Sequence, residues 1–124
     1  MKRDLDQRLR RFATRILGLA NELYKRPGAR RMADQIAGSG PSIRLNYAES
    51  QAASSKNHFI SLIETTEREA RETQAALEII IDVAYVNPKR LTDLYIESCE
   101  IVAILTTIAK NAKANRGKEK RRKR

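Results

Sequence analysis

Three glutamates could bring carboxylates together in this chain, namely Glu49, Glu69 and Glu72. Grouped carboxylates can bind metal ions or exchange protons, and helical bundles build di-metal centres from Glu-x-x-His motifs on facing helices. The single histidine, His58, has Ser55 three residues before it, so this motif is absent. We therefore expect no metal site, no cofactor and no acid–base catalysis from these residues.

A thiol and an imidazole could form a nucleophile and its general base, and the chain has one of each, Cys99 and His58. If the last two helices are antiparallel about residue 87, Cys99 lies level with about residue 75. His58 is then about 25 Å further along, well beyond hydrogen-bond reach of about 3 Å. The glycines at 38–40 lack the strand and the Lys-Ser/Thr of a phosphate loop, so they indicate a helix break. We expect a structural thiol, a surface histidine and no enzyme.

Basic residues gather at the two ends of the sequence. Residues 1–31 carry a net charge of +7, residues 113–124 carry +7, and residues 32–112 carry −4, within a total of +10. Such ends favour binding to the phosphates of RNA or DNA, with little base reading, whereas a merely solubilising tail is the alternative. The candidate nucleic-acid-binding residues are Arg8, Arg11, Arg15, Lys25, Arg26, Arg30, Arg31, Lys118, Lys120, Arg121, Arg122, Lys123 and Arg124.

The elements that must position these residues are helical, because Ala, Leu, Glu, Arg and Lys dominate the composition. Apolar spacing predicts helices over about residues 4–25, 29–53, 55–86 and 88–112. We therefore predict an all-α fold, an antiparallel four-helix bundle formed by residues 1–112. Pro41 predicts a kink or short break in the second helix. Residues 113–124 lack apolar periodicity, which predicts a disordered basic tail.

The third helix has the clearest buried face. Apolar or small residues alternate steps of four and three, which predicts a heptad-like seam. These residues are Phe59, Ile63, Thr66, Ala70, Thr73, Leu77, Ile80 and Ala84. The connection at Asn87-Pro88 is very short, so the last two helices must be antiparallel neighbours.

Two sequence segments resemble the helix-two and helix-three signatures of the protein family encoded by intervening sequences in bacterial 23S rRNA genes, sometimes called S23-like. The segments are QIAGSGPSIRLNYAES (35–50) and HFISLIETTEREARETQAAL (58–77), and the similarity extends over about residues 5–112. This family is related to the accessory variability determinant protein of diversity-generating retroelements. The resemblance implies a four-helix bundle, a homopentameric ring, association with nucleic acid and, in the retroelement relatives, with a reverse transcriptase. It brings no catalytic residues.

A polar stripe on the second helix, beside its apolar face, also needs a role. In a bundle of this family it should face the third helix, and we expect an inter-helix network of hydroxyl, amide and carboxylate groups. A network of this kind helps to fix helix register when all its groups are satisfied. The alternative is a stripe that faces solvent. The predicted members are Ser42, Asn46, Glu49, Glu69, Glu72 and Thr73.

The compartment and the partners are also constrained by the sequence. The N-terminal residues lack an apolar signal segment, no apolar run approaches 18 residues, and one cysteine cannot form an internal disulfide. We therefore expect a cytoplasmic protein that does not bind membranes. An alternative to nucleic-acid binding is a scaffold that docks a partner protein, with the basic ends serving solubility.

Overall fold

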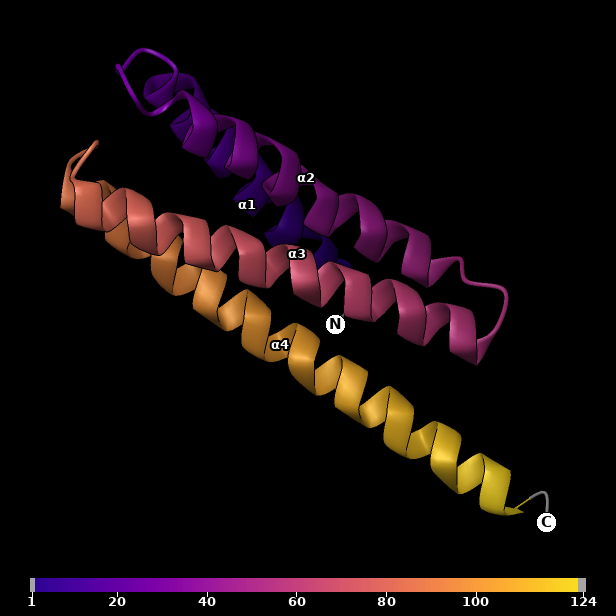
Figure 1. Ribbon diagram of the computed structural model, residues 1–124. Helices are drawn as coiled ribbons and strands as arrows, with labels where there is room; N and C mark the ends of the chain where they lie inside the picture. The colour runs from indigo at the N-terminus through magenta and orange to yellow at the C-terminus, as the bar shows by residue number, and fades with distance from the viewer. Residues whose placement is uncertain (1, 123–124) are drawn as a thin grey trace.

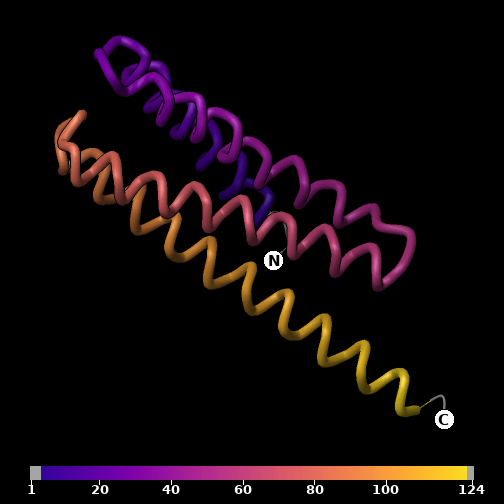
Figure 2. Tube along the Cα trace, viewed as in Figure 1, coloured from indigo at the N-terminus to yellow at the C-terminus, as the bar shows by residue number. Residues whose placement is uncertain are grey.

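The chain folds into four helices joined by short turns, in a computed structural model that describes residues 2–122 (Figure 1). The helices are α1 (Lys2–Leu23), α2 (Arg30–Gln51), α3 (Lys56–Val83) and α4 (Pro88–Arg122). Successive helices run antiparallel and pack against one another, as the Cα trace shows (Figure 2). The predicted all-α, antiparallel four-helix bundle is confirmed.

The ends of α3 and α4 follow local sequence signals. Ser55 precedes α3 in an extended conformation, and its hydroxyl accepts a hydrogen bond from the backbone N–H of His58 at 3.1 Å. Ala84 ends α3 with a φ of 58°, the left-handed conformation common at helix C-termini. Asn87 then accepts a bond from the N–H of Lys89, and Pro88 occupies the first position of α4.

The core is aliphatic and continuous through the bundle. Residues with less than 2% exposure come from all four helices, and Phe12 is the largest of them. The seam predicted for α3 is largely confirmed, because Ile63, Thr66, Ala70, Thr73, Leu77 and Ile80 are buried. Phe59 is only partly buried, because it lines a hollow beside Asp4 and Leu5 near the start of α1.

The helix break predicted at the glycine–proline segment is wrong. Helix α2 continues through Gly38, Gly40 and Pro41 without interruption, whereas a kink at Pro41 stays a prediction. The reason for Gly40 is packing: a Cβ there would lie 2.6 Å from Cγ2 of Ile16 on α1. Glycine therefore allows α1 and α2 to approach closely, and it does not end the helix.

The disordered tail predicted for residues 113–124 is also corrected, as far as the structure describes it. Helix α4 runs to Arg122, so the boundary placed after residue 112 falls inside a helix. Three polar contacts join this segment to the beginning of α3: Lys113 with Glu64 at 2.7 Å, Arg116 with Asn57 at 3.0 Å, and Glu119 with Lys56. Lys, Arg, Glu and Ala are strong helix formers, and these contacts replace the apolar packing that the prediction required. Lys123 and Arg124 lie outside the described residues.

Candidate functional site

The polar stripe of α2 bonds to its own helix and does not reach α3. The Ser42 hydroxyl donates to the carbonyl of Gly38 at 2.8 Å, and the Asn46 amide donates to the carbonyl of Ser42 at 3.0 Å. Glu49 is exposed to solvent. These three residues therefore do not form the predicted inter-helix network. The Ser42 bond spans Pro41, whose nitrogen cannot donate a hydrogen bond, and the Asn46 bond follows in the next turn.

A buried hydroxyl pair forms a polar link between α2 and α3 instead. Ser39 and Thr73 lie 2.7 Å apart, oxygen to oxygen, with 3% and 0% exposure. The Thr73 hydroxyl also donates to the carbonyl of Glu69 at 2.9 Å, so Ser39 must be the donor within the pair. Thr73 is thus the predicted network member that links the two helices. Ser39 lies about one helical turn before Ile43, and both residues are on the buried side of α2. This position relative to Ile43 was the sequence signal for Ser39.

Glu69 and Glu72, the two predicted network glutamates of α3, differ in their surroundings. Burial raises the pKa of Glu69, the charge of nearby Glu72 raises it further, and Arg68 partly opposes both. Glu72 is exposed.

Arg8 has a structural contact, although its sequence position suggested phosphate binding. Its guanidinium binds Glu97 through Nη2 at 2.5 Å and Nε at 3.1 Å, and it reaches Glu100 at 2.8 Å. These hydrogen bonds raise the pKa of Arg8 further above its usual value. They join α1 to α4, where Arg90 and Glu22 form a second ion pair. Arg8 is therefore not available to a phosphate in the way that an unpaired arginine is.

The remaining predicted cations form two separate clusters. The turn pole consists of Lys25, Arg26, Arg30 and Arg31, around the connection between α1 and α2. The tail pole consists of Lys118, Lys120, Arg121 and Arg122, in the last turns of α4. All eight side chains are exposed, and none bonds or pairs with another residue in the described range 2–122. Arg11 and Arg15 are likewise exposed on α1.

The two poles lie at opposite ends of the molecule (Figure 1). Helix α4 begins beside the turn pole and ends in the tail pole, and its 35 residues span about 50 Å. The sequence did not indicate this separation, because it depends on the tail being a helix that continues the bundle axis. One phosphate group cannot meet both poles, but a long polyanion or several chains can.

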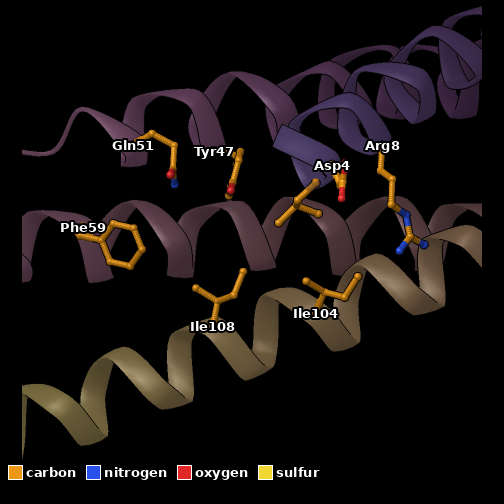
Figure 3. Close-up of a pocket in the computed structure, with 8 residues that line it drawn as sticks. Asp4, Arg8, Tyr47, Gln51, Phe59, Ile104 and Ile108 are labelled. Carbon is orange, nitrogen blue, oxygen red and sulfur yellow. The ribbon is translucent and has the colours of Figure 1, made fainter. Parts of the chain in front are cut away.

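An apolar groove lies between the poles, nearer the tail. It has a volume of about 460 Å³ and is lined by side chains from all four helices (Figure 3). Tyr47 and Gln51 extend from α2 on one side, and Ile104 and Ile108 extend from α4 on the other. The complete lining is Asp4, Leu5, Arg8, Tyr47, Gln51, Phe59, Ile104 and Ile108. Sequence reasoning missed this groove, since Phe59 was expected in the buried seam of the third helix and Arg8 was expected to bind phosphate.

The groups considered for catalysis are far from one another. Cys99 accepts a hydrogen bond from Gln74 at 3.2 Å, close to the predicted level of residue 75. His58 is exposed in the first turn of α3, beside Ser54. Among the residues that the structure describes, no three His, Cys, Asp or Glu side chains gather closely enough to bind a metal ion.

The fold and these surfaces define a small basic bundle of four helices with cations at both ends. The family model described as 23S rRNA-intervening sequence protein matches residues 2–107. The match covers most of the sequence, so the chain belongs to this family and the resemblance is confirmed. A relation to the retroelement proteins stays a prediction.

A solved structure supports the same assignment. The chain is similar to a protein of unknown function from the S23 ribosomal protein family of Bacteroides thetaiotaomicron VPI-5482, with a TM-score of 0.80 and 31% identity. The similarity covers 86% of this chain and 98% of the other. No curated protein matches. None of the helices in the described part of the chain is long and apolar enough to cross a membrane.

Proposed function

We propose that this protein is a non-enzymatic nucleic-acid-binding protein that contacts the phosphates of RNA or DNA through its turn and tail poles. The observation that carries the proposal is the exposure of eight cations without acidic partners among the described residues. Several other cations, such as Arg44 with Asp6 and Arg8 with Glu97, are paired within the fold. The unpaired groups can exchange their counterions for phosphates without breaking an internal contact.

The proposal includes assembly into a homopentameric ring, which the family resemblance implies. Five copies would multiply the two poles, and multivalent contacts would raise the overall affinity for a long polyanion. Within this proposal the protein acts as an accessory factor of a retroelement reverse transcriptase. Light-scattering mass of the intact protein, with and without a short structured RNA, tests the stoichiometry.

The salt dependence of binding tests the phosphate contacts. Affinity for a labelled RNA or DNA duplex should fall steeply between about 50 and 300 mM salt. Replacing all four tail-pole cations by Gln should lower the slope of log affinity against log salt by about 3–4 for duplex DNA. The four turn-pole cations should be replaced in the same way, so that the contributions of the two ends can be compared.

A matched control distinguishes specific contacts from loss of net charge. Arg121→Gln removes an unpaired cation, and Arg44→Gln removes one that binds Asp6 at 3.1 Å. Both variants lose one charge, but only Arg121→Gln should lower the salt slope. Binding that stays constant from low to high salt would contradict the proposal.

The alternative function is a scaffold that docks a partner protein. Two large apolar side chains on α3, Ile79 and Val83, lie one helical turn apart with 49% and 50% exposure. An exposed apolar pair of this kind favours a protein contact more than a phosphate contact. Ile79→Ser should leave nucleic-acid binding intact and abolish partner binding if this alternative is right.

A further inference from the structure

One face of α4 changes in character along its length. Ile104, Ile108, Asn111, Asn115, Lys118 and Arg122 follow one another at steps of four, three, four, three and four. This spacing places the six residues on a single stripe of the helix, which we call the α4 stripe. The stripe passes from two isoleucines through two amides to two cations, and the continuity of α4 to Arg122 keeps it straight.

The apolar half of the α4 stripe forms one wall of the apolar groove. Figure 3 shows Ile104 and Ile108 facing Tyr47 and Gln51, with Phe59 at the end of the groove toward the tail. Tyr47 is 3% exposed and Phe59 is partly buried, so Phe59 presents more aromatic surface to the groove than Tyr47 does. The volume of about 460 Å³ is within the range of small-molecule sites, about 300–1,000 Å³.

The polar half of the stripe forms a second hollow further along α4. This hollow of about 250 Å³ is lined by Lys56, Asn115, Lys118, Glu119 and Arg122. Lys56 and Glu119 pair with each other. Lys118 and Arg122 make no bond to another residue within the described chain, and both are exposed. The hollow therefore presents two available cations close to the end of an apolar, aromatic groove.

We propose that the apolar groove receives an unpaired nucleobase, and that Lys118 and Arg122 bind the phosphates of the adjoining strand. The inference rests on the proposed nucleic-acid binding and specifies its substrate as a single-stranded segment. Single-strand binding combines aromatic walls for the bases with cations for the backbone, and the α4 stripe supplies both in one line. Asn111 and Asn115, between the two parts, can donate to sugar or base oxygens.

Charge supports a nucleotide over a purely apolar occupant. An apolar helix from a partner protein, or from a second copy of this chain, would fill the groove but would leave the two cations of the stripe without a counterpart. A nucleotide strand meets both parts at once. A duplex cannot enter the groove, because its bases are stacked and paired.

The test uses a single-stranded oligonucleotide of about 12 nucleotides with one 2-aminopurine, whose emission reports the surroundings of the base. Binding should change this emission, and the same label inside a duplex should show no such change. Ile108→Trp fills the groove and should weaken single-strand binding about fivefold or more, with little effect on duplex binding. Thr107→Trp is the matched control, because Thr107 is the exposed neighbour of Ile108 and is not part of the groove lining.

A second variant guards against an effect on folding. Phe59→Leu retains an apolar wall but removes the aromatic ring, so it should reduce the 2-aminopurine response while thermal unfolding changes little. Equal single-strand affinity for Ile108→Trp and Thr107→Trp would overturn the inference, even if salt-dependent duplex binding persists and supports the proposed function. A lower light-scattering mass for Ile108→Trp alone would assign the groove to a contact between copies and would also overturn it. Absence of any nucleic-acid binding by the wild-type protein would overturn both proposals.

Discussion

The contact between α1 and α2 and the contact between α3 and the end of α4 are held by different forces. At the first, Gly40 allows Ile16 to approach the backbone of α2, in a region without exposed surface. At the second, long charged side chains such as Lys113 and Glu64 bridge two helices whose facing surfaces are exposed to solvent. Apolar contact is sensitive to a single methyl group, whereas exposed ion pairs contribute little each. The contact between α1 and α2 should therefore tolerate little change in side-chain size, whereas single ion pairs near the end of α4 should be lost with little effect on stability.

The largest expected effect comes from adding a methyl group at the close contact. Gly40→Ala places a Cβ 2.6 Å from Ile16 Cγ2, so one helix must shift and the free energy of unfolding should fall by about 1–3 kcal/mol. Urea unfolding measures this change. Gly38→Ala is the control, because a Cβ at Gly38 meets nothing within 4 Å and should stabilise α2 by up to about 1 kcal/mol.

A double-mutant cycle sharpens the same prediction. Gly40→Ala should cost less in an Ile16→Ala background, because that substitution removes Cγ1 and Cγ2, two of the atoms that the new methyl group would meet. Equal costs of Gly40→Ala in the two backgrounds would show that the destabilisation does not come from this contact.

The next effect concerns the buried hydroxyl pair of Ser39 and Thr73 between α2 and α3. Thr73→Val removes the acceptor of the buried Ser39 hydroxyl and should destabilise the protein by about 1–2 kcal/mol. Adding Ser39→Ala should recover most of that loss, because neither hydroxyl then needs a partner. If the double variant is less stable than Thr73→Val alone, the pair is not the source of the effect.

The basic segment should respond in helicity and not in global stability. Gly117→Pro interrupts α4 between the bundle and the tail pole, and it should reduce helicity in circular dichroism while changing the free energy of unfolding by less than about 0.5 kcal/mol. Gly117→Ala has room for its methyl group and should raise helicity at the same net charge. A disordered tail would show no difference between the two variants.

The smallest effect is a pH dependence of the same segment. The hydrogen bond from Lys113 holds the pKa of Glu64 below its usual value, so this contact contributes stability above the unfolded pKa of the carboxyl. That contribution is lost as the pH falls through the lower, folded pKa, and the last turns of α4 should lose helicity there. Lys113→Gln should remove this transition, which helicity measured against pH would detect. Persistence of the transition in Lys113→Gln would assign it to another carboxylate.

Much of the fold could be predicted because each helix has a clear local signal. Ser55, Asn87 and Pro88 are at helix starts, and the apolar spacing of α3 identifies its buried side. Gly40 could not be interpreted in this way, because a glycine beside a proline suggests a break unless the neighbouring helix is known. The prediction of a disordered tail was wrong for a related reason, since the helix in this segment depends on polar partners in α3 that are distant in sequence.

The sequence identified which cations are exposed, but it did not show how they are arranged in space. The cations were identified from charge alone, and ten of the eleven that lie in the described range are exposed without an acidic partner there. Arg8 is the exception, because its partners on α4 are known only once the helices are packed. The apolar groove could not be inferred, because side chains from all four helices form it and it exists only once the helices are packed.

The close contact at Gly40 also has a consequence for the order of folding. Its two helices are adjacent in the sequence and are joined by a short turn, so docking them closes only a small loop. We expect this hairpin to form in the transition state, with the polar contacts of the α4 end added afterwards. Stopped-flow measurements of Gly40→Ala should then show slower refolding with a nearly unchanged unfolding rate, whereas changes in the α4 end should leave the refolding rate unaltered.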